Sequence, residues 1–309
     1  MSSIRFIQRP LLDNAKWDAL ILRSLHSLPY ALTWYLDAVA ENWDALVLGD
    51  YKAVMPLTWL RKLGVKCVYQ PYYCQQLGVF SDAPLSPDII RQFITQANEN
   101  FPYVNFNLNP SATTVAAEFG MASKRNLFLD LNTDYKTLTK SFSSNHKRNI
   151  SRAEKAGLRF NAGVSVKAFQ NFYLQTIDRK KQVFKPVHQK AFIAISNAII
   201  QQGYGKIYGV EDTAGNLTAA LLLIMHRRRF INIINTSSAE GKKNGASHFL
   251  FNEVIKEHAN NGALFDFEGS SIPSVARFYE GFGASEETFY HYKDSILKNP
   301  RQHFKMKLV

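Results

Sequence analysis

The hydrophobic and polar positions of this chain trace one order of elements twice. In the first part, two apolar runs in DALVLGDYKAVMPLTWL flank Gly49 and Asp50, a pair typical of tight turns, so we predict a β-hairpin. Apolar residues then recur at helical spacing after Pro87, and YVNFNLN follows as a strand. Before the hairpin, the same reasoning predicts a strand and two helices, at Ile4–Gln8, 17–26 and 32–39.

The second part repeats this order of hairpin, helix and strand. YGVEDTAGNLTAALLLIMHRRRFINIINTSS predicts strands joined by polar turns, and a helix over 246–260 leads past Gly262 into a strand over 264–268. The pattern predicts an α/β protein with mixed (α+β) sheets and two domains, 1–128 and 129–309. One continuous domain is the alternative, because no Pro/Gly/Ser-rich linker separates the halves.

The last of these strands carries two acids. Side chains alternate along a strand, so Asp266 and Glu268 are expected on one face and Phe265 and Phe267 on the other. Neighbouring like charges raise the pKa of one carboxyl group, which suits a general base near neutral pH. The pair is therefore a candidate catalytic base, and the alternative is a surface pair bridged to Arg or Lys.

A helix is predicted to follow, with Ser270 or Ser271 as its cap and Pro273 in its first turn. Apolar positions recur along it, and Tyr279 falls on the inner face. Its hydroxyl either reaches a polar tip from the core or protonates a leaving group.

The segment SSAEGKKNGAS connects a predicted strand to a predicted helix. Backbone amides at a helix N-terminus, with lysines beside them, can form a binding site for a pyrophosphate. The alternative is an ordinary exposed turn. The candidate phosphate-binding residues are Lys242, Lys243, Asn244, Gly245 and Ala246.

The helix predicted within SSNHKRNISRAEKAG places Arg148, Arg152, Lys155 and Arg159 roughly in a row, if the helix continues to its end. Arg148 and Arg152 are candidates for binding the phosphates of a substrate. A second basic cluster, 179–185, follows another helix. The alternative for both is a solvated charged face.

Composition narrows the class of protein. With 309 residues, 46% of them hydrophobic, the chain can fill a sizeable core, and its formal charge of +12 favours an anionic partner. The two cysteines match neither a metal site nor a disulfide framework, and neither a signal core nor a membrane-spanning run is present in the sequence, so we expect a cytoplasmic protein without a metal.

Three motifs carry a resemblance to a known family. SFSSNHKRNISRAEKAGL, SHFLFNEVIKEHANNG, and FDFEGS followed by ARFYEGFGA resemble the GNAT superfamily of acyltransferases, in the branch of the Fem peptidoglycan aminoacyltransferases. The resemblance implies two tandem GNAT-like domains and an N-acyltransferase that uses acyl-CoA or acetyl-CoA as a phosphate-bearing donor. It also implies that Tyr279 is the acid toward the leaving thiolate, although 241–246 keeps only the last small residue of the family's phosphate loop.

Two other functions compete with this one. The first is a Fem-like transfer from aminoacyl-tRNA to a nucleotide-linked cell-wall precursor peptide. The second is a non-catalytic RNA-binding protein on a decayed transferase fold, with Tyr69, Tyr72 and Tyr73 stacking on bases. In either transferase, Glu268 or Asp266 would take the proton of the acceptor amine.

Overall fold

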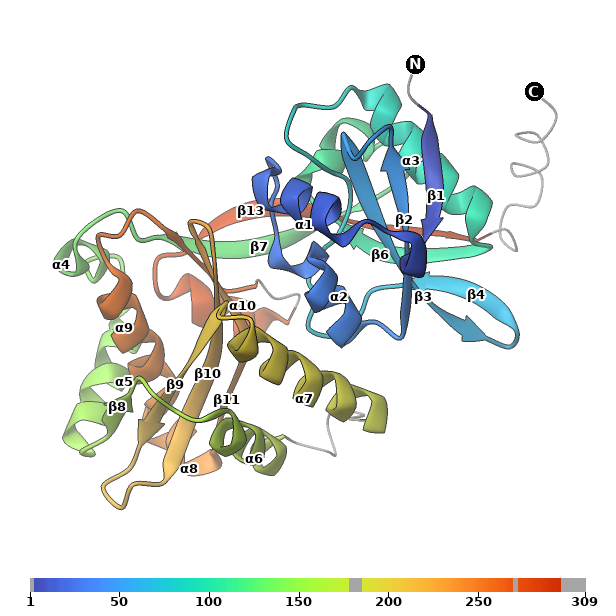
Figure 1. Cartoon of the computed structure of the whole chain (residues 1–309). Helices are drawn as coiled ribbons and strands as arrows, with labels where there is room; N and C mark the ends of the chain where they lie inside the picture. Colours follow the sequence, from blue (N-terminus) through green and yellow to red (C-terminus); the bar gives the residue numbers. More distant parts are fainter. Residues whose placement is uncertain (1–2, 178–184, 269–271, 296–309) are drawn as a thin grey trace. The chain divides into compact units, whose positions relative to one another are not determined.

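The computed structural model describes residues 3–177, 185–268 and 272–295 and divides the chain into two compact units (Figure 1). The first unit contains Met1–Lys124 and Thr288–Val309, and the second contains Arg125–Glu287. The sequence pattern predicts a boundary at 128/129 and a second domain that runs to the end of the chain. The contacts instead divide the chain at Lys124 and return the residues after Glu287 to the first unit.

The first unit is a mixed sheet with helices packed on it, in the strand order β1-β2-β3-β4-β6-β13. Its strands are β1 (Ile4–Gln8), β2 (Asn42–Leu48), β3 (Ala53–Lys62), β4 (Val65–Tyr69), β5 (Phe80–Ser81), β6 (Tyr103–Leu108) and the end of β13 (Ser285–Ser295). Its helices are α1 (Asn14–Arg23), α2 (Thr33–Val39) and α3 (Pro87–Asn100), with 3-10 turns at Arg9–Leu11, Pro29–Ala31 and Pro110–Val115.

Local sequence explains where these elements begin. The helix expected after Pro87 is α3, in which Pro87 occupies the first turn and Ser86 accepts a hydrogen bond from the amide of Ile89. The face of α3 that contains Ile90 and Phe93 is buried against the sheet. The predicted hairpin of β2 and β3 is confirmed.

The last strand explains why the chain returns to the first unit. β13 pairs antiparallel with β6, from Tyr290 opposite Leu108 to Ser295 opposite Tyr103. The ring of Tyr292 is buried with that of Phe106, and its hydroxyl accepts a 2.7 Å hydrogen bond from Asn98 Nδ2. The strand therefore completes the core of the first unit.

The second unit is a mixed sheet in the order β7-β12-β11-β10-β9-β8. Its strands are β7 (Ala122–Asp130), whose first residues belong to the first unit, β8 (Arg159–Asn161), β9 (Gly205–Glu211), β10 (Leu217–His226), β11 (Arg229–Ser237) and β12 (Leu264–Asp266). Its helices are α4 (Tyr135–Leu138), α5 (Ser144–Lys155), α6 (Val166–Thr176), α7 (Pro186–Gln201), α8 (Ala239–Lys243), α9 (Ala246–His258) and α10 (Pro273–Glu280).

Helices pack against β9–β11, and α5 packs on α9 (Figure 1). The aromatic centre of the core is Phe251 of α9, whose ring contacts those of Phe265, Phe267 and Phe282. The predicted fold class is confirmed, since both units combine a mixed sheet with helices. Within the described ranges, none of the helices combines the length and apolar character needed to cross a membrane.

Two expected elements are shorter than predicted. β12 ends at Asp266 and not at Glu268, because the backbone reaches a positive φ of 56° at Glu268. α5 ends at Lys155, so Arg159 lies in β8 and does not continue the basic row of the helix. Residues 270 and 271, expected to cap α10, and the basic residues 179–181 lie outside the described residues.

We expect Tyr292→Ala to lower the free energy of unfolding by about 3–5 kcal/mol, because it empties an aromatic site in the core. Lys293→Ala on the same strand removes an exposed side chain and should change that free energy by less than about 0.5 kcal/mol. Denaturant unfolding of both variants checks the prediction. Equal effects would show that the returning strand does not complete this core.

Candidate active site

The candidate site lies in the second unit, where the short strand β12 ends while its neighbour β11 continues. The two strands pair in parallel at three positions only, from Arg229 opposite Leu264 to Ile231 opposite Asp266, although β11 continues to Ser237. The amide of Phe267 then donates to the carbonyl of Leu127 in β7 at 2.9 Å. The chain after β12 therefore continues beside β7, while Asn232 Nδ2 of β11 lies 3.5 Å from the carbonyl oxygen of Phe267.

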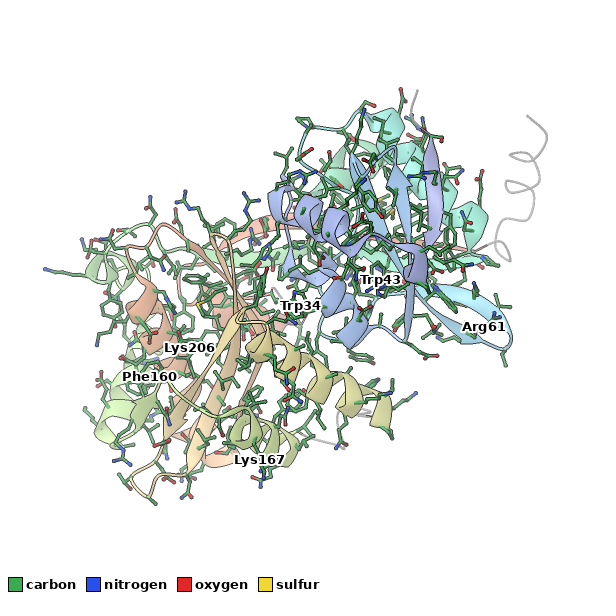
Figure 2. The ribbon with its side chains drawn as sticks, in the orientation of Figure 1. Trp34, Trp43, Arg61, Phe160, Lys167 and Lys206 are labelled. Carbon is green, nitrogen blue, oxygen red and sulfur yellow. The ribbon has the colours of Figure 1, made fainter. Side chains whose placement is uncertain are left out.

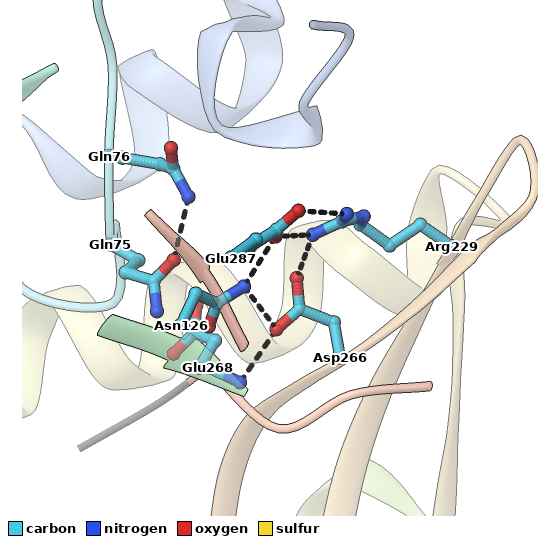
Figure 3. A network of polar contacts seen from close by, with 7 residues as sticks. All are labelled: Gln75, Gln76, Asn126, Arg229, Asp266, Glu268 and Glu287. Atoms are coloured by element: carbon cyan, nitrogen blue, oxygen red, sulfur yellow. Dashed lines mark hydrogen bonds and ion pairs between the residues drawn. The ribbon is translucent and has the colours of Figure 1, made fainter. Parts of the chain in front are cut away.

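A buried ionic network fixes the paired end of these strands (Figure 3). Arg229 Nη1 lies 2.5 Å from Asp266 Oδ2 and 2.5 Å from Glu287 Oε1. Asn126 Nδ2 donates to Asp266 Oδ1 at 3.0 Å and to Glu287 Oε1 at 2.8 Å. Burial alone would lower the pKa of Arg229, but the two carboxylates raise it, so the guanidinium stays charged.

Asp266 is enclosed by this network. It is 1% exposed, and its Oδ1 also accepts a 2.7 Å hydrogen bond from the amide of Glu268. Burial raises the pKa of Asp266, while the Arg229 charge opposes that shift. Because both of its oxygens are already bonded, Asp266 is placed to hold the strands together and not to take a proton from a substrate.

Tyr279 of α10 lies beside the part of β11 that continues past its pairing with β12. Its ring is 6% exposed, and its hydroxyl oxygen accepts hydrogen bonds from Asn232 Nδ2 and Asn235 Nδ2, each at 3.2 Å. Asn232 is buried, whereas Asn235 is exposed. Burial raises the pKa of Tyr279 to about 12, and the negative charge of Glu268 contributes in the same direction. The phenol is therefore protonated at neutral pH and keeps its own proton to donate.

Glu268 follows the end of β12 with an unusual backbone. Its φ of 56° lies in the left-handed region, which costs a non-glycine residue about 1 kcal/mol. Its side chain is half-buried and close enough for its charge to act on Tyr279. Strain of this kind often accompanies a functional position. The prediction that Asp266 and Glu268 share one face of a strand is therefore wrong, because the strand ends between them.

A joint between α5 and α10 holds Tyr279 in place. The amide of Ser143 donates to the carbonyl of Gly281 at 2.8 Å, and His146 Nε2 lies 2.8 Å from the carbonyl of Phe278. A carbonyl only accepts, so Nε2 carries the ring proton, and Nδ1 accepts from the Ser143 hydroxyl at 2.8 Å. The motif that begins SFSSNH is thereby bound to the motif FYEGFGA.

The predicted phosphate loop has a different conformation from the one expected. The short helix α8 has Ser238 as its N-cap, and the amides of Lys242, Asn244 and Gly245 donate to backbone carbonyls within the same segment. A Cβ on Gly245 would lie 2.3 Å from the carbonyl oxygen of Asn149. These three amides are already paired and are not available to a pyrophosphate. Phosphate binding at this segment stays a prediction that depends on its lysine side chains and on the first amides of α9.

The two predicted groups of basic residues are neighbours. Arg152 Nη1 lies 3.4 Å from the carbonyl oxygen of Lys243, which brings α5 to the C-terminal end of α8. Arg148, Arg152, Lys242 and Lys243 are all exposed. Ala246, in contrast, is buried at the start of α9 and contributes to the core.

Sequence reasoning missed the residues that complete this site. They are Asn126, Arg229, Asn232, Asn235 and Glu287. A signal for three of them was present in the strand RFINIINTS, where an arginine and two asparagines interrupt an otherwise apolar run. Within 3–177, 185–268 and 272–295, no group of three or more His, Cys, Asp and Glu residues is suited to hold a metal ion.

No protein-family model and no curated protein matches this sequence. Several solved structures match its fold. FemX has a TM-score of 0.66 at 12% identity, covering 93% of this chain and 96% of its own. The C-terminal domain of a putative lysylphosphatidylglycerol synthetase from Agrobacterium fabrum has a TM-score of 0.60 at 13% identity, covering 91% and 92%.

A tandem GNAT protein from the clavulanic acid biosynthesis pathway has a TM-score of 0.58 at 13% identity, covering 94% of this chain and 98% of its own. The resemblance to the tandem GNAT fold of Fem-type transferases is therefore confirmed at the level of the fold.

We expect Gly281→Ala to lower the free energy of unfolding by about 1–3 kcal/mol, through overpacking in the joint between α5 and α10. The added Cβ would lie 2.0 Å from His146 Cε1. Gly163→Ala is the matched control, since its nearest neighbour would be 3.8 Å away. Urea unfolding compares the two, and an unperturbed Gly281→Ala protein would show that the joint is loose.

Stability should also depend on pH through His146, which is buried, and His248, which is half-buried. Burial lowers the pKa of His146, and it lowers the pKa of His248 from 6.5 to about 4. Between these values the unfolded chain binds more protons than the folded one, so stability falls as the pH drops from 6.5 to 4. Unfolding measured across this range in wild type and His248→Gln should show a flatter dependence in the variant. The same slope in both would exclude His248 as a cause.

Proposed function

We propose that the second unit transfers an acyl or aminoacyl group to an amine. The observation that carries this proposal is the protonated Tyr279 hydroxyl, held by Asn232 and Asn235 where β11 leaves β12. The tandem GNAT fold supports the same class of reaction, because similar structures include FemX and a putative lysylphosphatidylglycerol synthetase domain.

The chemistry can be assigned to the residues of this site. The acceptor amine attacks the carbonyl carbon of the donor, and its proton passes to Glu268 directly or through water. The tetrahedral oxyanion then collapses, the bond to the leaving group breaks, and Tyr279 donates its proton to the departing thiolate or alkoxide. Asp266 positions the strands and does not touch the substrate.

A bulge in β11 supplies a candidate donor for the oxyanion. The register with β10 shifts between Leu222 opposite Ile234 and Leu223 opposite Asn232, so Ile233 is the extra residue. The extra residue of a bulge leaves the hydrogen-bond ladder, which frees its backbone groups for other partners. We assign the oxyanion contact to this part of the strand, beside Asn232.

Two classes of acyl donor are compatible with this proposal. The paired amides of Lys242, Asn244 and Gly245 weigh against a CoA pyrophosphate bound by those three groups. The exposed basic side chains of Arg148, Arg152, Lys242 and Lys243 support phosphate contacts by charge, as an aminoacyl-tRNA donor requires. Acyl-CoAs and aminoacyl-tRNAs are therefore the two donor classes to compare, with amine acceptors that include nucleotide-linked cell-wall precursor peptides.

We expect Tyr279→Phe to lower kcat about 100-fold or more with little change in KM, because the variant keeps the buried ring and loses the hydroxyl that donates the proton. Turnover with the donor and acceptor that react in the screen measures this effect. Tyr135→Phe is the matched control, since its hydroxyl donates to Asn252 Oδ1 at 2.8 Å elsewhere in the same unit. Turnover by Tyr279→Phe equal to that of the control would remove Tyr279 from the mechanism.

A further inference from the structure

The hairpin of β3 and β4 in the first unit has an unusual tip. Lys62 pairs with Val65, so the turn contains only Leu63 and Gly64 (Figure 2 labels Arg61 beside it). Both turn residues have positive φ, 48° for Leu63 and 80° for Gly64. This is the geometry of a type I′ turn, in which asparagine or aspartate is the usual first residue.

Leucine is energetically unfavourable at this position of the turn. A branched apolar side chain is strained at positive φ, and Leu63 contacts nothing that could repay the strain, since it is fully exposed. Val65, across the turn, is 43% exposed. The tip therefore presents apolar side chains to the surroundings at a place where folding alone favours a polar residue.

Positive charge surrounds this apolar tip. Arg61, Lys62 and Lys66 lie within the two strands next to the turn, and no acid occurs from Leu60 to Lys66. Lys66 Nζ stacks 4.3 Å from the ring centroid of Trp59, while Arg61 Nη1 donates to the carbonyl of Gly64 at 3.2 Å. An apolar tip inside a basic collar matches the boundary between acyl chains and anionic headgroups of a bilayer.

We propose that this hairpin docks the protein on an anionic lipid bilayer by inserting Leu63 among the acyl chains. Val65 lies at the same interface, and the basic side chains of Arg61 and Lys62 contact the headgroup phosphates. One leucine with two cations gives weak, reversible attachment and not a permanent anchor. This docking is independent of the transfer reaction proposed for the second unit.

Cosedimentation of the full chain with vesicles tests the proposal, with phosphatidylcholine alone or mixed with phosphatidylglycerol. Wild type should bind the mixed vesicles and not the neutral ones. Leu63→Asn should weaken binding about tenfold or more, the equivalent of burying one leucine. Lys62→Gln should weaken it about fivefold, and the effect should diminish as salt is added.

The asparagine variant separates docking from folding. Because Asn-Gly is the preferred type I′ pair, Leu63→Asn should unfold at the same or a higher urea concentration than wild type. Leu11→Asn replaces another exposed leucine, 77% exposed in the same unit, and should bind vesicles like wild type. Equal binding by Leu63→Asn and wild type would overturn the proposal, since charge elsewhere on the chain would then hold the vesicles.

Insertion itself can be observed directly. Cys67 and Cys74 are buried, so a Leu63→Cys protein can be labelled at the tip with a polarity-sensitive dye. Its emission should shift to the blue when mixed vesicles are added. An unshifted emission on bound protein, or a shift produced by RNA alone, would also overturn insertion at this hairpin.

Discussion

The second unit depends on the ion pair between Arg229 and Asp266. It joins Arg229, at the first of the three positions where β11 and β12 pair, to Asp266 at the last. Glu287 accepts from Arg229, and Asn126 donates to Asp266. A buried charge left without its partner costs about 3–5 kcal/mol, so this network holds its members in one arrangement. Beyond it β12 ends while β11 continues, and Asn232, Asn235 and Tyr279 meet beside that end.

Tyr279 of α10 is positioned by residues from a distant part of the chain. α5 grips the C-terminal end of α10 through Ser143 and His146, and Tyr279 lies within the helical turn that they hold. The glycine at 281 is required there because the His146 ring fills the place of a side chain. Fixed strands on one side and a fixed helix on the other give the Tyr279 hydroxyl a defined position, as proton transfer requires.

Local patterns allowed much of the fold to be predicted. The hairpin of β2 and β3 and the helix α3 follow from turn residues and apolar spacing, which depend only on near neighbours. The end of β12 was not predicted, because Asp266 and Glu268 alternate like any strand pair, whereas the strand ends where the Asp266 carboxylate accepts a hydrogen bond from the amide of Glu268. The returning strand was also missed, since its pairing with β6 joins positions far apart in the sequence.

Only those residues of the candidate site that lie in a local motif could be predicted from the sequence. Tyr279 and Glu268 lie in a motif that can be read locally, whereas Asn126 and Glu287 become neighbours only through the sheet. The segment 242–246 was read from its lysines and glycines as a phosphate-binding loop, and that reading stays a prediction. Its local pattern did not show that part of it forms α8 and that three of its amides are paired.

Hydrogen exchange with donor present tests the central claim most directly, because it reports where on the chain a donor binds. Acyl-CoAs and aminoacyl-tRNAs would be compared, each with its deacylated form. The account predicts slower exchange in β11 from Asn232 to Asn235 and in the residues that flank Glu268, with the acylated form of one donor class only. Protection confined to the first unit, or equal protection by acylated and deacylated forms with no change in β11, would contradict it.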